Sequence, residues 1–392
     1  MRGLIVLIML QGHVLDGWVR PQDRAGEWFW LSQFLGGFPA PVFLFLVGIS
    51  LAIVLDRMRE KGASSRELAM KVLRRGGWIL FLAYAFRLEQ FLVWYPASQW
   101  TGLLIVDTLN CIAICTLFVG LFSAACGSRR TNIVTMGATT IAFVFMTPLV
   151  YPWKGLPSFF LSYLNGDGHP SYFSFFPWAA FTLAGVTFGY MLLEARGRVG
   201  EREFFKHVAV AAVCLYAVGV SMSLTRFFEY GFFDYSLTSP HFFFVRLGWI
   251  LLIVCGAYKW SIRKTAGGWS PLITLGQASL IVYWLHIEIV YGRLFHHFSR
   301  SLELPQAAVQ LAWVVPLMLM AASISSFRPA LARAQQLFKG RSIRDGLPAG
   351  EVFAKVRGRF AVERSAIAQK RDAIIAAGSD DDSGEISFPQ YR

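Results

Sequence analysis

Apolar segments of near-constant length alternate with short polar segments along most of the chain. An α-helix needs about 20 mostly apolar residues to cross the hydrocarbon core of a bilayer, and ten segments come close to that length. We therefore predict an all-α, polytopic integral membrane protein with about ten transmembrane helices. The predicted helices span Gly3 to Val19, Phe38 to Leu55, Val72 to Val93, Leu103 to Ala125, Ile133 to Val150, Phe175 to Leu193, Val208 to Leu224, Phe242 to Trp260, Leu272 to Tyr291 and Ala307 to Ser325.

Composition supports a membrane protein and argues against a nucleic-acid-binding one. The chain has 392 residues, of which 55% are hydrophobic and 16% charged, and its mean hydropathy is +0.48. This is too apolar for a soluble domain of this size. The formal net charge is +13, but the basic residues gather between the apolar segments and in the tail, so we expect a lipid bilayer as partner and no nucleic acid. The five cysteines show no metal-ligand spacing, and we expect no metal.

The basic residues also predict an orientation. The connection from Asp56 to Arg75 carries seven Lys or Arg residues, and every second connection after it is basic, whereas the alternate connections are poor in Lys and Arg. By the positive-inside rule, we expect the protein in the cell (inner) membrane with both termini cytoplasmic. Residues 1–325 form the predicted transmembrane domain, and 326–392 a cytoplasmic tail. Within that tail we predict a short basic helix from Arg328 to Lys339 and a largely disordered remainder.

The first predicted helix carries ionisable residues inside an apolar stretch, which requires a reason. Arg2 and His13 are eleven residues apart, almost three turns, so their side chains lie on one face roughly 16 Å apart along the axis. Asp16 follows one turn later, where a carboxylate can orient an imidazole. We interpret His13 as a general base in the outer half of the helix; the alternative is a packed histidine that bonds a neighbouring helix.

Other ionisable residues fall in the outer halves of later helices, which predicts an outward-facing polar cavity. Asp107 either orients His13, binds substrate, or forms a salt bridge with Arg87 or Arg246. We predict Arg87, Arg246 and His286 as substrate-binding residues.

Several segments, taken in order, resemble the heparan-alpha-glucosaminide N-acetyltransferase-like family of transmembrane acyltransferases. The likeness runs from Met1 to about Ser325, and the first-helix pattern of an arginine, ten residues and a histidine is also similar to that of the bacterial acyltransferase-3 proteins. The segments are RGLIVLIMLQGH, APVFLFLVGISLAI, LRRGGWILF, VDTLNCIAI, FFPWAAFTLAG and LGQASLIVYWLH.

This resemblance implies transfer of an acyl group, typically acetyl, from cytosolic acyl-CoA to a sugar on the far side of the membrane. By position, His13 matches the catalytic histidine of the bacterial relatives and Arg2 their adjoining arginine. We predict His13, Asp16 and Asp107 as catalytic residues and Arg2 and Arg75 as binding the acyl-CoA. The extended pantetheine arm would bridge the interval between Arg2 and His13, and the acyl group would pass to the acceptor directly or through an acyl-histidine.

The sequence departs from the relatives in two places. They usually carry an acidic residue a few positions before the arginine, whereas this chain begins one residue before Arg2, so we expect a truncated start. The lysosomal enzyme has asparagine where His13 stands and a histidine in the following loop, but Gly17 to Gly37 here contains no histidine. The lysosomal mechanism therefore does not transfer directly.

Two other classes of function fit parts of the pattern. Ten helices with buried charges also suit a solute or proton-coupled transporter, although the sequence shows no inverted repeat and no pair of broken helices. A non-catalytic envelope-assembly protein that keeps the fold is the third possibility. The sequence also leaves a homodimer open.

Overall fold

The computed structural model describes residues 1–167, 170–198, 200–225, 238–262 and 270–345. The secondary structure in these ranges is helical apart from two isolated β-bridges. The chain divides into a unit Met1–Ile324 and a unit Ser325–Arg392. The elements are α1 (Arg2–Trp18), η1 (Pro21–Asp23), α2 (Glu27–Gly36), α3 (Pro39–Glu60), α4 (Ser65–Trp94), η2 (Trp100–Leu104), α5 (Thr108–Ala125), α6 (Arg129–Val150), α7 (Ser158–Leu164), α8 (Phe175–Arg198), α9 (Glu201–Thr225), α11 (Pro240–Ser261), α12 (Pro271–Gln277), α13 (Ser279–Val290), η3 (His296–Phe298) and α14 (Leu304–Asp345).

The described helices confirm an all-α membrane protein, but the number of spanning helices is smaller than ten by a strict criterion. Seven are long and apolar enough to cross a membrane, and up to eight if the bent pair α12 and α13 is one span. The two remaining predicted spans correspond to α1 and α4. Helix α1 has only 17 residues, and α4 carries Arg87 and Glu89 within its apolar part. Ten is thus an approximate number.

Local sequence explains where the long helices begin. Ser64 and Glu67 form a capping box at the start of α4, in which each side chain accepts a hydrogen bond from the other's backbone N–H. Asp107 caps α5, where its carboxylate accepts the N–H groups of Leu109 and Asn110. These caps satisfy donors that a helix start otherwise leaves unpaired.

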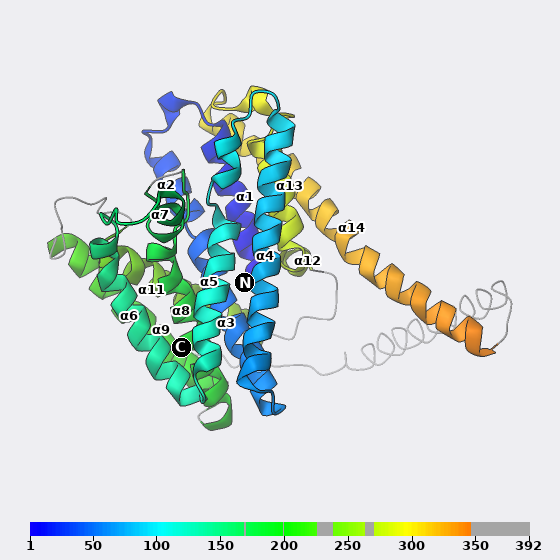
Figure 1. Ribbon diagram of the computed structural model, residues 1–392. Helices are drawn as coiled ribbons and strands as arrows, with labels where there is room; N and C mark the ends of the chain where they lie inside the picture. Colours follow the sequence, from blue (N-terminus) through cyan, green and yellow to red (C-terminus); the bar gives the residue numbers. More distant parts are fainter. Residues whose placement is uncertain (168–169, 199, 226–237, 263–269, 346–392) are drawn as a thin grey trace, which may run out of the picture. The chain divides into compact units, whose positions relative to one another are not determined.

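Within the first unit, the helices pack as interlocking pairs. Helix α3 lies against α8, α9 against α11, α4 against α5, and α6 against α8 (Figure 1). A Cβ at Gly185 in α8 would stand 2.1 Å from the carbonyl oxygen of Phe45 in α3, so only glycine permits this approach. Gly185 therefore permits the close packing of α8 against α3.

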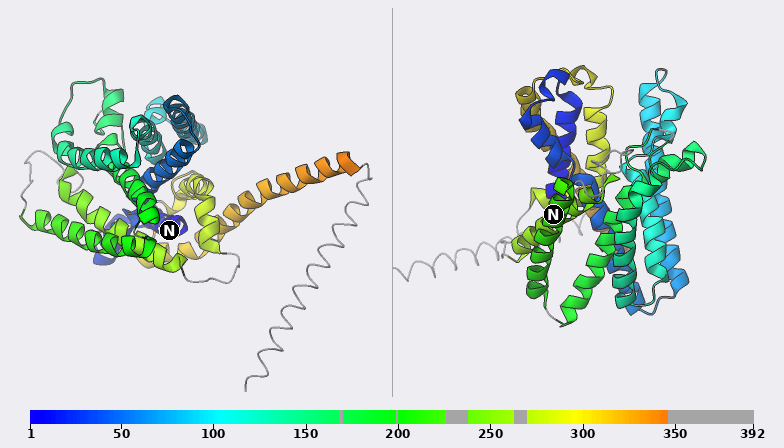
Figure 2. Two further views of the ribbon diagram at one scale, coloured as in Figure 1. Left: turned by 90° about the horizontal axis from the view of Figure 1, so that it is seen from below. Right: turned by 90° about the vertical axis from the view of Figure 1, so that its left-hand side faces the viewer.

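The predicted helix from Leu272 to Tyr291 is broken. Helices α12 and α13 meet at an angle of 86°, because Ala278 between them leaves the helical conformation. The start of α1 crosses this region, where Gly3 lies against the backbone of Leu272. In Figure 1 and in the right-hand view of Figure 2, the N-terminus lies about halfway along α4 and not level with the start of that helix.

The tail is described only in part. The segment predicted as a separate basic helix, Arg328 to Lys339, belongs to the continuous helix α14. The predicted disordered remainder lies largely outside the described residues.

Candidate functional site

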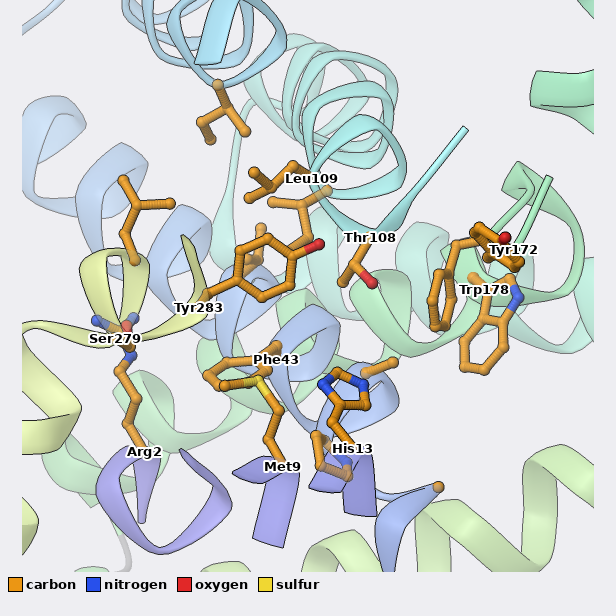
Figure 3. Close-up of a pocket in the computed structure, with 18 of the residues that line it drawn as sticks. Arg2, Met9, His13, Phe43, Thr108, Leu109, Tyr172, Trp178, Ser279 and Tyr283 are labelled. Atoms are coloured by element: carbon orange, nitrogen blue, oxygen red, sulfur yellow. The ribbon is translucent and has the colours of Figure 1, made fainter. Parts of the chain in front are cut away.

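A cavity of about 450 Å³ lies inside the first unit, between α1, α3, α4, α5, α11 and α13 (Figure 3). This volume falls in the range of about 300–1,000 Å³ that is usual for ligand sites. Arg2 and His13 reach it from the same face of α1, with Met9 between them, and Tyr283 and Thr108 lie across from them. The spacing predicted from the sequence thus places a cation and an imidazole in one cavity.

The cavity wall is cationic. Three arginines line it, Arg2, Arg75 and Arg246, and its lining residues, all within the described part of the chain, include no Asp or Glu. Guanidinium groups gathered in a cavity without carboxylates create a positive potential that favours anionic ligands, above all phosphates and carboxylates.

Arg2 and Arg75 form one cationic group. The two positive charges repel each other, and neither arginine has an ion pair or side-chain hydrogen bond to another described residue. Arg75 is the eleventh residue of α4, so it lies about 15 Å from the start of that helix. Two neighbouring guanidinium groups without a carboxylate partner favour an anionic ligand.

Arg246 is held more firmly. Its Nη1 donates to the carbonyl oxygen of Gly37 at 2.6 Å. Its guanidinium carbon lies 5.1 Å from the ring centre of Phe38 and 4.8 Å from that of Phe242. The two cation–π contacts and the hydrogen bond fix the group at the cavity wall, with its remaining N–H donors available.

His13 meets a second histidine. Its Nδ1 lies 2.7 Å from Nε2 of His286, and the two rings are nearly parallel, with 4° between their planes. His286 is 0% exposed, and its Nδ1 lies 2.8 Å from the carbonyl oxygen of Val282. His286 does not line the cavity and contacts His13, which does. Because the two histidines are 273 residues apart in sequence, local sequence patterns could not predict this pairing.

Asp16 does not orient the imidazole of His13. Its carboxylate is paired with Arg24 at 3.4 Å and accepts a hydrogen bond from the hydroxyl of Tyr291 at 3.1 Å. The described residues show no hydrogen bond between the Asp16 carboxylate and the His13 imidazole, whose Nδ1 contacts His286 instead. Asp16 lies one turn beyond His13 on nearly the same side of α1, but Arg24 and Tyr291 engage its carboxylate.

Arg87 and Asp107 pair with each other rather than line the cavity. Arg87 Nη2 lies 3.0 Å from Asp107 Oδ2, and the side chains are only 10% and 5% exposed. Arg87 Nη1 also donates to Gln90 Oε1 at 2.7 Å. Of the alternatives for Asp107, the described residues show the salt bridge with Arg87 and a helix cap, and no hydrogen bond to His13.

Sequence reasoning missed the aromatic part of the cavity wall. Tyr172, Trp178 and Phe242 line it, as does Tyr283, which lies three residues before His286 in the segment LIVYWLH. In Figure 3, Tyr172 and Trp178 lie on the His13 side of the cavity and away from Arg2. Tyr283 and His286 are three residues apart, which places them on one face of a helix. Aromatic residues are too common in these helices for this spacing to indicate a site.

The described residues contain no group of three or more His, Cys, Asp or Glu side chains arranged to hold a metal ion. The polar groups at this site belong to the arginines, the histidine pair and a few hydroxyl side chains.

Comparison with known proteins identifies the family. No curated protein matches the chain. The family model described as "Heparan-alpha-glucosaminide N-acetyltransferase, catalytic" matches residues 1–217, which include Arg2, His13 and Arg75 but neither Arg246 nor His286. A match over more than half of the 392 residues assigns the membership. The chain thus belongs to the heparan-alpha-glucosaminide N-acetyltransferase catalytic family, a family of membrane acetyltransferases.

Proposed function

We propose that this protein transfers an acetyl group from cytosolic acetyl-CoA to an amino sugar or other glycan acceptor on the extracytoplasmic side of the cell membrane. The observation that carries the proposal is the single cavity that holds Arg2, Arg75 and His13 together. Arginines that bind an anion and an imidazole that moves a proton are the two requirements of acyl transfer from a phosphate-bearing thioester.

Arg2 and Arg75 would hold the phosphates of the donor. Their guanidinium groups have no carboxylate partner among the described residues, so a phosphate would neutralise a charge that the protein leaves uncompensated. Arg2 and His13 belong to one continuous helix, and eleven residues of α-helix span roughly 16 Å. A long, thin pantetheine arm matches that interval.

His13 would act as the general base. It takes the proton from the acceptor amine or hydroxyl as the nitrogen or oxygen attacks the thioester carbonyl. The carbon–sulfur bond then breaks, and the thiolate of CoA receives the proton from the His13 imidazolium. The products are the acylated acceptor and CoA with a free thiol, so atoms and charge balance without a further reagent.

The acceptor would occupy the part of the cavity lined by Arg246, Tyr172 and Trp178. Arg246 offers N–H donors that Gly37 does not use, and the aromatic rings supply flat apolar surface. The orientation follows from the basic connections of the sequence, which put the start of α4 on the cytoplasmic side, so the donor would enter from that side and the acceptor from the other.

The transport alternative receives less support from the helix arrangement. Carriers built from inverted repeats have broken helices in corresponding positions of both halves. The described residues contain one strongly bent pair, α12 and α13, rather than two.

The test is acetyl transfer by purified protein in lipid nanodiscs, measured as release of the CoA thiol with a glucosamine-terminated oligosaccharide as acceptor. We expect His13→Ala to lower kcat by about 100-fold or more, because general base catalysis contributes roughly 10²- to 10⁴-fold. His297→Ala is the matched control, since that histidine is exposed and lies outside the cavity. Wild-type turnover by His13→Ala would refute the proposal, as would accumulation of acceptor in vesicles without CoA release.

A further inference from the structure

The histidine pair fixes which ring nitrogen of His13 is free for chemistry. A neutral imidazole carries one N–H and one lone pair, so in the contact between His13 Nδ1 and His286 Nε2 one ring donates and the other accepts. Which ring donates decides whether the proton of His13 is on Nδ1 or Nε2. This choice is set by the second bond of His286.

The backbone decides the direction. Nδ1 of His286 lies 2.8 Å from the carbonyl oxygen of Val282, and a carbonyl oxygen can only accept, so this nitrogen carries the proton of His286. An imidazolium with both nitrogens protonated is disfavoured here because His286 is 0% exposed and no described carboxylate bonds its ring. Nε2 of His286 is therefore an acceptor. It follows that Nδ1 of His13 donates, and the lone pair of His13 lies on Nε2.

We propose that His286 is a positioning residue that holds His13 in the Nδ1–H tautomer, so that Nε2 of His13 is the nitrogen that removes the acceptor's proton. This inference rests on the proposed function of His13. His286 cannot be the base itself, because it is fully buried and does not line the cavity, whereas His13 does. Buried partners that fix the tautomer of a catalytic histidine are a general way to orient the ring.

Contacts between α1 and α13 hold the two histidines at the same height along the paired helices. Gly17 and Val290 each lie four residues, about one turn, after His13 and His286. A Cβ at Gly17 would stand 2.6 Å from the side chain of Val290, and the indole Nε1 of Trp18 donates to the Val290 carbonyl at 3.0 Å. These contacts one turn further along set the register of α1 against α13, and with it the distance between the two rings.

The break before α13 serves the same alignment. Val282 is the residue one turn before His286 in α13, and it is 0% exposed and belongs to the same apolar cluster as Val6, Leu10 and Val14 of α1. The carbonyl that orients His286 is therefore held in the core, near the start of a helix that begins at Ser279. His286 lies beyond residues 1–217, so the family match does not assign it.

Activity of paired variants tests the positioning role. His286→Leu keeps a side chain of moderate size but removes the acceptor nitrogen. We expect kcat to fall about 10- to 100-fold while KM for acetyl-CoA stays within about twofold of wild type. His286→Gln restores an acceptor oxygen at similar reach, and we expect it to recover kcat to within about fivefold of wild type. A merely structural role for His286 would lower the melting temperature of both variants without this difference in kcat.

A spectroscopic measurement tests the tautomer independently of activity. In protein labelled with ¹⁵N-histidine in nanodiscs, we expect His13 to show a protonated Nδ1 and an unprotonated Nε2, with scalar coupling from Nδ1 to His286 Nε2 across the hydrogen bond. A protonated Nε2 in wild-type His13 overturns the inference even if the enzyme is active. Wild-type kcat in His286→Leu also overturns it, while an inactive His13→Ala would leave the proposed function standing. Full activity of His13→Ala would instead overturn the proposed function and, with it, the positioning role.

Discussion

Replacing Asp107 by asparagine separates a structural role from a catalytic one. The sequence allowed either, and the structure places the carboxylate against Arg87 with only 5% of the side chain exposed. The Oδ1 atom also caps α5 through Leu109 and Asn110 at 2.8 and 3.2 Å. Asparagine keeps an oxygen for the cap and removes the charge. Asp107→Asn therefore breaks the ion pair and little else.

The magnitude follows from burial. Removing one partner of a buried ion pair leaves an uncompensated charge and costs about 3–5 kcal/mol. Both side chains here are at least nine-tenths buried, at a separation of 3.0 Å, so the full range applies to the Arg87 charge that remains. Asp107→Ala would lose the cap as well, which adds about 1 kcal/mol. The double variant Arg87→Gln with Asp107→Asn has no uncompensated charge, so we expect it to be less destabilised than the sum of the single variants.

Titration with denaturing detergent gives the free energy of unfolding, and turnover below the transition gives kcat. We expect Asp107→Asn to unfold at markedly lower detergent and to keep kcat within about threefold of wild type, because a residue outside the cavity contributes no transition-state contact. Glu203→Gln is the control, since its pair with Lys206 is exposed and should not change stability measurably. Unchanged stability with a 100-fold loss of kcat would show that Asp107 takes part in the reaction and would refute this reasoning.

Two further predictions address the donor site and the helix packing. Arg75→Gln should raise KM for acetyl-CoA about 10-fold or more with kcat little changed, because it removes a charge-assisted contact to a phosphate. Arg74→Gln is the control, since Arg74 is exposed on the same helix, and an equal effect of both substitutions on KM would contradict a specific site. Gly185→Ala should lower the free energy of unfolding by about 1–3 kcal/mol through overpacking against Phe45, whereas Gly77→Ala, where nothing lies within 4 Å of the added Cβ, should be neutral or slightly stabilising. Equal stability of the two glycine variants in the same detergent titration would contradict the close contact of α3 and α8.

The helices were largely predictable because a bilayer imposes length and apolarity on each spanning segment. The break between α12 and α13 was not, because its cause is tertiary. The segment from Leu272 to Tyr291 is apolar throughout, and the bend at Ala278 accommodates the crossing of α1 at Gly3. Hydropathy cannot report this crossing, because the contacting residues Gly3 and Leu272 are 269 positions apart in sequence.

The site was predictable where it depends on one helix and not where it depends on several. Arg2 and His13 share a face of α1 by helical geometry alone, and the structure places both at one cavity. Asp16 is also close in sequence, so local reasoning favoured it as the partner of His13. The actual partner, His286, comes from another helix and depends on the register of α1 against α13, which a single sequence does not specify.

The break at Ala278 connects these observations. Because α12 turns across the start of α1, α13 begins midway along the bundle, and Ser279 and Leu280, its first residues, line the cavity. The same turn places Arg2 against Gly276 and close to Arg75 of α4. One turn into α13, Val282 orients His286, which in turn contacts His13. A continuous helix in this place could not both line the cavity near Arg2 and Arg75 and supply the partner of the His13 imidazole. The bend therefore brings the proposed donor site and the proposed base to one cavity.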